Sequence, residues 1–348
     1  MNIEDVFLKF KPKSFPHDDD YVSVYKTLKQ KLDKQIHPEV KVKMKEYHLD
    51  DYYNDHGIDH IKMVIERVSK IIECLNPTYS KINQKDKYYI SPYEIFILLM
   101  SIQIHDAGHV LGTRKEHAGK AKALLSKLDL GEQLTAPEKK IIGDIAKSHG
   151  GTDNPIGKLQ SSFDLTHENI RPQFLASLLR LADELAEDTS RTSRFLLVND
   201  QISKTSEIYH QYSLCVNSVR ISGKEISIKF YLNEDTSTKL FKKETKDGIV
   251  ETYLIDEIYE RTMKTFTETL YCARFLPENC RFNSLKITIF IDDKDHESII
   301  EPIAFELKET GYPLLSHNGK IYDICSDLKD DGIEKNGKYY ADLINLKK

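Results

Sequence analysis

Apolar side chains recur at helical spacing through the first half of the chain. Between positions 58 and 75 they fall three or four residues apart, which predicts an amphipathic helix with one buried stripe. The stripe consists of Ile61, Val64, Ile65, Val68, Ile71 and Ile72. Similar patterns predict helices at about 21–49, 118–128, 136–149 and 172–186. We therefore expect a mainly α-helical N-terminal bundle, with His37 and His48, which lie among charged residues, at its surface.

One predicted helix is apolar on every side and ends in two ligand-type side chains. Residues 95–104 are almost wholly apolar, and the Ser-Pro-Tyr-Glu sequence at 91–94 is a typical helix start. His105 and Asp106 follow directly. Because a buried carboxylate is costly unless it is paired or coordinated, the sequence predicts a divalent metal at this point.

Further polar side chains interrupt the other predicted helices at or near their ends. These are His60, His117, His149 and Asp183. The ends of helices in a bundle can converge on one site, so we expect these residues to join His105 and Asp106. Imidazole and carboxylate ligands suit Mn, Fe, Co, Ni or Zn, bound as one ion or two; Mg is a weaker candidate because it favours oxygen ligands.

The pattern changes to an alternating one at about residue 204. Residues 209–221 and 225–232 alternate like two strands, 251–274 form an amphipathic helix, 286–291 another strand and 297–308 a further helix. This order predicts a smaller α+β domain with an antiparallel sheet, for which a ferredoxin-like arrangement is one candidate. We expect a helical arm at 1–50, a metal-binding helical domain at 51–203 and a regulatory or oligomerisation domain at 204–348.

Composition narrows the class of protein. The 348 residues are 40% hydrophobic and 30% charged, with a net charge of −5. The first residues lack the basic start and apolar run of a signal peptide, and no run of the sequence predicts a membrane span. The five cysteines show no paired metal spacing, so a cytoplasmic protein with reduced thiols is expected. The acidic balance counts against a dedicated nucleic-acid binder.

The order His, His-Asp, His, His, Asp resembles the HD superfamily of metal-dependent phosphohydrolases, over about residues 50–195. The matching pieces are Asp55–Ile61 (DHGIDHI), Ile104–His109 (IHDAGH), Glu116–Ala121 (EHAGKA) and Leu178–Leu185 (LLRLADEL). Each piece alone is weak, but four in this order are specific. The last, with the downstream Arg191, looks like HD proteins of bacterial nucleotide signalling and defence. The His-Asp-x-Gly-His piece is similar to deoxynucleotide triphosphohydrolases.

The resemblance implies a role for each matching residue. The ligands of one metal would be His60, His105, Asp106 and Asp183. His117 and His149 would bind a second metal or the substrate phosphate, and Asp106 could bridge two metals. His109 would contact the phosphate or support the ligands, and is a candidate general acid. His56 is an alternative to His60, although His60 is better placed on the apolar stripe.

Basic side chains near these motifs are candidates to bind the substrate phosphate, because Arg in particular suits bidentate contacts with phosphate. They are Lys115, Lys147, Arg180, Arg191 and Arg194. Each of them could instead be a solvated surface charge without a role in binding. For Arg180, an ion pair beside the site is favoured over a contact with the substrate. His117 and His149 can likewise cap helix carbonyls without binding a metal.

Three functions of different classes remain. The favoured one is a phosphohydrolase that cleaves a phosphoester or phosphoanhydride bond of a nucleotide with a metal-activated water. The second is an HD-type nuclease acting on single-stranded nucleic acid, against which the acidic charge counts. The third is a non-catalytic sensor that binds a nucleotide and signals through its C-terminal domain. For any of them we expect a homo-oligomer and no membrane partner.

Overall fold

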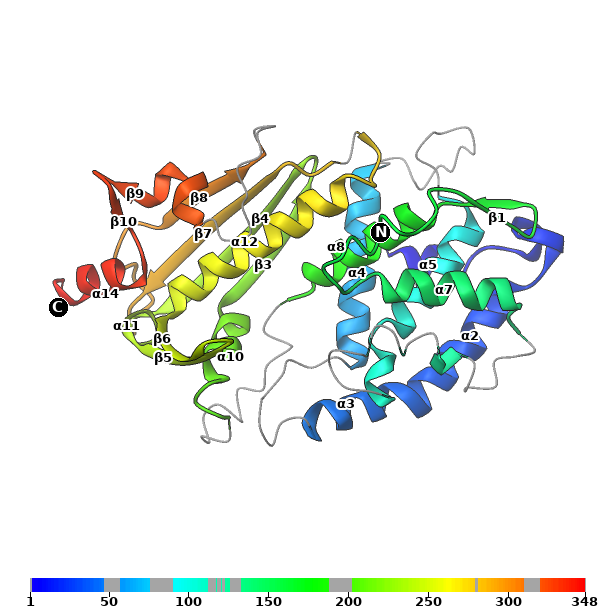
Figure 1. Ribbon diagram of the computed structural model, residues 1–348, viewed down its shortest axis with the longest axis horizontal. Helices are drawn as coiled ribbons and strands as arrows, with labels where there is room; N and C mark the ends of the chain where they lie inside the picture. Colours follow the sequence, from blue (N-terminus) through cyan, green and yellow to red (C-terminus); the bar gives the residue numbers. More distant parts are fainter. Residues whose placement is uncertain are drawn as a thin grey trace. The chain divides into compact units, whose positions relative to one another are not determined.

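The computed structural model describes residues 2–46, 57–75, 90–111, 117, 120, 123–125, 133–187, 202–278, 281–309 and 320–347 (Figure 1). The contacts divide the chain into two compact units. The first comprises Met1–Glu46, Asp55–Ala186 and Cys272–Arg281, and the second Tyr47–Asn54, Glu187–Tyr271 and Phe282–Lys348.

The first unit is helical and is built around α5, Pro92–Ile104, whose thirteen residues are all buried. Helices α2 (Tyr21–Lys31), α4 (Ile58–Leu75), α7 (Ala136–Lys147) and α8 (Pro172–Glu184) pack against it. The predicted start of α5 is confirmed: the Ser91 hydroxyl accepts from the Glu94 amide, and the Glu94 carboxylate accepts from the Ser91 amide. α7 begins with the same reciprocal pair, Thr135 and Glu138. These caps fix where each helix enters the core.

The N-terminal segment contributes to the same core. It contains α1 (Ile3–Phe7), short 3-10 turns at Pro12–Ser14 and Pro16–Asp18, a π-helical stretch at Leu32–Ile36 and α3 (His37–Glu46). Phe7 is fully buried and its ring lies against those of Tyr25 and Phe96. A small antiparallel hairpin, β1 (Phe163–Leu165) and β2 (Glu168–Ile170), precedes α8.

His37 is buried, with 3% of its surface exposed, so its predicted surface position is wrong. Its Nδ1 lies 2.9 Å from an Asp33 carboxylate oxygen, and its Nε2 lies 3.0 Å from the carbonyl oxygen of Gln103. Gln103 is in the last turn of α5, where helix carbonyls lack partners within the helix. His37 is buried because it supplies a partner to one of them.

The second unit contains a mixed sheet of four strands in the order β3-β4-β7-β8. The strands are Val216–Ser222, Glu225–Asn233, Ser284–Asp292 and Ile303–Lys308. β4 and β7 run parallel, with helix α12 (Leu254–Ala273) in the connection between them. The other two pairs are antiparallel. The predicted antiparallel sheet is therefore wrong in its centre, because a helical crossover lets the chain re-enter the sheet in the same direction.

Smaller elements complete this unit. They are α10 (Glu207–Cys215), α11 (Glu234–Thr238), the β5–β6 hairpin (Leu240–Thr245 and Gly248–Tyr253), α13 (Ile321–Ile324), a 3-10 turn at Ser326–Leu328, the β9–β10 pair (Lys329–Asp330 and Ile333–Glu334) and α14 (Gly337–Asn345). This order also differs from the β-α-β-β-α-β order of a ferredoxin-like fold.

Two predicted elements of this region have the wrong type. Residues 209–215 are helical rather than extended, because the buried side chains of Ile208, Tyr212 and Cys215 fall four and three positions apart. The predicted helix at 297–308 is replaced by β8, in which Ile303, Phe305 and Leu307 alternate inward. The helix predicted at 251–274 and the strand predicted at 286–291 are confirmed as α12 and β7. No helix among the described residues is long and apolar enough to cross a membrane.

Candidate metal centre

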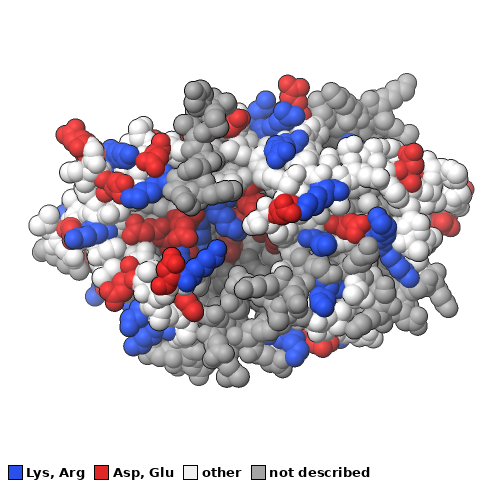
Figure 2. All heavy atoms as spheres, in the orientation of Figure 1, with Lys and Arg blue, Asp and Glu red and all other residues white. Residues whose placement is uncertain are grey.

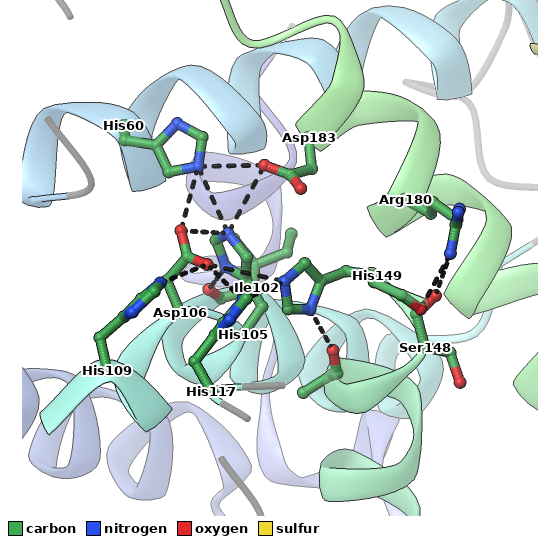
Figure 3. Close-up of polar contacts among 12 residues, drawn as sticks. His60, Ile102, His105, Asp106, His109, His117, Ser148, His149, Arg180 and Asp183 are labelled. Carbon is green, nitrogen blue, oxygen red and sulfur yellow. Dashed lines mark hydrogen bonds and ion pairs between the residues drawn. The ribbon is translucent and has the colours of Figure 1, made fainter. Parts of the chain in front are cut away.

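The end of α5 carries His105 and Asp106 into the interior of the first unit (Figure 3). His105 is fully buried and Asp106 is 6% exposed. The chain then makes a 3-10 turn, Ala107–Val110, which places His109 beside Asp106. A helix without a polar face thus delivers three polar side chains to one buried point.

A first group of ligand-type atoms surrounds Oδ2 of Asp106 and Oδ1 of Asp183. The Nε2 atom of His105 lies 3.1 Å from the Asp106 oxygen and 3.7 Å from the Asp183 oxygen. The Nε2 atom of His60 lies 3.5 Å and 3.1 Å from the same two oxygens. The two Nε2 atoms are 3.3 Å apart. His60, in the first turn of α4, and Asp183, near the end of α8, thus meet at the end of α5.

A second group gathers around the other oxygen of Asp106, Oδ1. It lies 3.5 Å from Nε2 of His117 and 3.6 Å from Nε2 of His149, and these two nitrogens are 3.1 Å apart. His109 contributes a third imidazole, with its Nε2 4.0 Å from the same oxygen and its ring stacked on that of His117. The two oxygens of one carboxylate therefore face two different sets of histidines.

Backbone carbonyls orient two of the rings. Nδ1–H of His105 donates to the carbonyl of Ile102 at 2.8 Å, and Nδ1–H of His149 donates to the carbonyl of Ala146 at 2.6 Å. In a neutral imidazole the other nitrogen then carries a lone pair, and in both residues that nitrogen is the Nε2 atom directed at Asp106. Such a hydrogen bond behind the ring is the usual support of a metal-binding histidine.

The charges of the site favour a cation at its centre. Burial alone would lower the pKa of His105, but the carboxylates of Asp106 and Asp183 raise it well above its usual value. Burial would raise the pKa of Asp183, but hydrogen bonds from His105 and His60 hold it well below its usual value. The Asp183 carboxylate therefore stays ionised, and the site stabilises a positive charge beside it. Burial, followed by the charge of His105, lowers the pKa of His149 to about 4, so this ring is neutral at pH 7.

The donor set fits a divalent metal. In the first group, ligand atoms of His60, His105 and Asp106 lie within 4.8 Å of one another; the same holds for Asp106, His117 and His149 in the second. Nitrogen and carboxylate donors in this mixture are those chosen by Mn, Fe, Co, Ni and Zn.

A comparison with protein families identifies the domain. The family model HD-CE matches residues 49–262, which is more than half of the 348 residues. The chain belongs to the HD-CE family. No curated protein matches the sequence. The HD-CE match contains all six predicted ligands, so the His and Asp cluster is the polar centre of an HD-type domain. The match continues past residue 203 and ends within α12.

The structure brings together most of the site residues predicted in this HD-CE chain. His60, His105, Asp106, His109, His117, His149 and Asp183 converge. Lys147 is exposed in the last turn of α7. Arg180 is buried, and its guanidinium donates to backbone carbonyls at the end of α7. His56, Lys115, Arg191 and Arg194 lie outside the described residues.

Sequence reasoning missed the groups behind the ligands in the HD-CE domain. The carbonyls of Ile102 and Ala146 orient two rings, and His37 holds the carbonyl of Gln103 two residues before His105. The pattern of side chains along the sequence does not show which backbone carbonyls will accept hydrogen bonds. Only the position of His105 and His149 at helix ends, three residues after a helical carbonyl, could have indicated them.

Proposed function

We propose that this protein is a metal-dependent phosphohydrolase that cleaves a phosphoester or phosphoanhydride bond of a nucleotide. The observation that carries the proposal is the position of Asp106, whose two oxygens face two sets of imidazole nitrogens at 3.1–3.6 Å. Membership of the HD-CE family and the resemblance of the motifs to HD phosphohydrolases support it.

The ligand groups have distinct tasks in this proposal. His60, His105, Asp106 and Asp183 would hold one divalent ion; Asp106, His117 and His149 would hold a second. When bound, such ions lower the pKa of a coordinated water and polarise a phosphoryl oxygen. The backbone carbonyls behind His105 and His149 keep both Nε2 atoms directed inward, so the two rings are oriented before any ligand arrives.

His109 is the candidate proton donor to the leaving oxygen. It is buried beside Asp106, and its ring stacks on His117 with the ring centres 4.1 Å apart. The stacked pair fixes the plane of the His109 ring next to the second group. A general acid must be held within reach of the oxygen that it protonates, and this packing supplies that restraint.

A small nucleotide is favoured over a nucleic acid as substrate. On the face shown in Figure 2, the described Lys and Arg side chains of each unit are interspersed with Asp and Glu. The described residues of this face therefore form no continuous basic surface, whereas nucleic-acid binding depends on neutralising many phosphates at once.

The proposal is tested by phosphate release from a panel of nucleoside mono-, di- and triphosphates and cyclic nucleotides, with added Mn²⁺. Asp106→Asn keeps the shape of the side chain and removes the charge that both groups share. Asp59→Asn is the matched control, because Asp59 is exposed on α4 beside His60 and pairs with Lys62. We expect release by the wild type and the control, and background release by Asp106→Asn.

Two other outcomes would contradict the proposal. Degradation of labelled single-stranded oligonucleotides, with no release from any mononucleotide, would make the protein a nuclease. Binding of a nucleotide without turnover, unchanged by Mn²⁺, Co²⁺, Ni²⁺ or Zn²⁺, would make it a sensor.

A further inference from the structure

Arg180 is a buried cation that none of the proposed metal-binding groups uses. It lies in α8, three residues before Asp183, and is 7% exposed. Its Nη1 donates to the carbonyl of Ser148 at 3.3 Å and to that of Gly150 at 3.0 Å; its Nη2 donates to the carbonyl of Gly151 at 2.9 Å. Figure 3 shows the Arg180 side chain directed at the backbone of Ser148.

These three carbonyls belong to the turn that carries His149. The turn follows α7, and its path depends on Gly151, which has a φ of +86°. The last carbonyls of a helix lack partners within the helix and form its negative end, so a guanidinium is a favourable partner for them. Arg180 therefore fixes the turn at Ser148, just before His149, and at Gly150 and Gly151, just after it.

Helix α8 thereby reaches both ligand groups. Residues three apart in a helix share a face, so Arg180 and Asp183 project from the same side of α8. Asp183 contributes a carboxylate to the first group, and Arg180 holds the backbone around His149 in the second group. The position of the Nε2 atom of His149, 3.6 Å from Oδ1 of Asp106, therefore depends on the path of this turn.

We propose that Arg180 is a positioning residue that sets the affinity of the second group for a metal ion, by holding the turn that carries His149. The inference rests on the proposed function and adds a residue that touches neither metal nor substrate. In this proposal Arg180 does not bind the substrate phosphate, because its guanidinium already donates hydrogen bonds to backbone carbonyl oxygens.

The test is calorimetric titration of the metal-free, full-length protein with Mn²⁺. Arg180→Lys keeps the charge and loses the fork. Arg171→Lys is the matched control: Arg171 also belongs to the α8 region and makes a forked contact, but its partner is Glu94 at the start of α5. We expect two classes of Mn²⁺ site in the wild type and in Arg171→Lys. In Arg180→Lys the second class weakens about 10- to 100-fold while the first is unchanged.

A second measurement does not depend on metal. In nitrogen-detected NMR of the imidazoles, His149 of the wild type carries its proton on Nδ1, the atom that donates to Ala146. We expect a mixture of tautomers in Arg180→Lys and the wild-type pattern in Arg171→Lys.

Four other results of these two measurements would contradict the positioning role of Arg180, the proposed function, or both. Unchanged Mn²⁺ binding and an unchanged His149 tautomer in Arg180→Lys would overturn the positioning role alone. One class of site in the wild type would do the same, because no second ion would then exist to be positioned. No Mn²⁺ binding by the wild type would overturn the proposed function and this inference together. Unfolding of Arg180→Lys, with Arg171→Lys folded, would assign Arg180 to the fold instead of the site.

Discussion

Asp106 is the residue that links the two ligand groups, because each of its carboxylate oxygens faces a different set of histidines. The fully buried His105 faces its Oδ2 and the largely buried His149 faces its Oδ1, each with its Nδ1 atom already bonded to a carbonyl. The sequence predicted these residues as ligands from their types and from their positions at helix ends. It did not predict how they are oriented, since the orienting groups are backbone atoms.

The low pKa of His149, about 4, gives a prediction for the metal-free protein. Because burial and the charge of His105 disfavour its protonated form, the ring should remain neutral down to about pH 5. In the unfolded chain the same ring takes up a proton near pH 6.5. This group therefore destabilises the fold progressively as the pH falls from about 6.5 to 4. An NMR titration of the His149 ring checks this, and a midpoint near 6.5 would contradict it.

Gly151 offers a test of the turn around His149. Its φ of +86° is strained for any residue with a Cβ, although a Cβ there would meet only Pro155 Cγ at 4.0 Å. We expect Gly151→Ala to lower the free energy of unfolding by about 1–2 kcal/mol and to weaken the second class of metal site.

Gly223→Ala is the control for this substitution, because Gly223 has a φ of +59° and open space around it, in the turn between β3 and β4. It should cost a similar free energy in urea unfolding and leave Mn²⁺ binding unchanged. Equal effects of the two substitutions on Mn²⁺ binding would contradict the importance of the turn.

At the scale of elements, helix starts were the most predictable feature and β8 the least. The Ser-Pro-Tyr-Glu sequence at the start of α5 is a local signal, and it forms the reciprocal cap that it indicates. The start of α7 has the same kind of cap, made by Thr135 and Glu138. Residues 303–308 form a strand because they pair with β7 in the sheet. A short apolar run does not reveal such a partner, so its spacing alone favoured a helix.

The starts of α5 and α8 are joined by an ion pair between the buried Glu94 and the partly buried Arg171, which gives a prediction for stability. Glu94 is 2% exposed and accepts hydrogen bonds from the backbone amide, Nε and Nη2 of Arg171. Glu94→Ala leaves the Arg171 charge without this partner and removes the cap of α5. We expect a loss of about 3–5 kcal/mol in the free energy of unfolding, measured with urea.

The exposed pair Asp59 and Lys62 provides the comparison. Lys62→Ala should cost at most about 0.5 kcal/mol, because exposed ion pairs in helices contribute little. A cost of Glu94→Ala no larger than that of Lys62→Ala would show that this contact does not hold the two helices.

At the scale of the whole molecule, the sequence predicted an α-rich chain with a separate sheet region but not the path through the sheet. The parallel pairing of β4 with β7 joins strands some fifty residues apart, separated by the β5–β6 hairpin and α12. Alternation of apolar and polar residues indicates that a segment is a strand, but it does not indicate which strand lies next to it in the sheet. The HD-CE match confirms the HD-type domain, and the nucleotide substrate and the homo-oligomer stay predictions.

Whether Asp106 is shared by two metal ions can be measured as the metal content of the purified protein, by elemental mass spectrometry of wild type, Asp106→Asn and Asp59→Asn. We expect close to two transition-metal ions per chain in the wild type and in Asp59→Asn, and almost none in Asp106→Asn. Equal metal content in all three proteins, or no metal in the wild type even after reconstitution with Mn²⁺ or Zn²⁺, would contradict it.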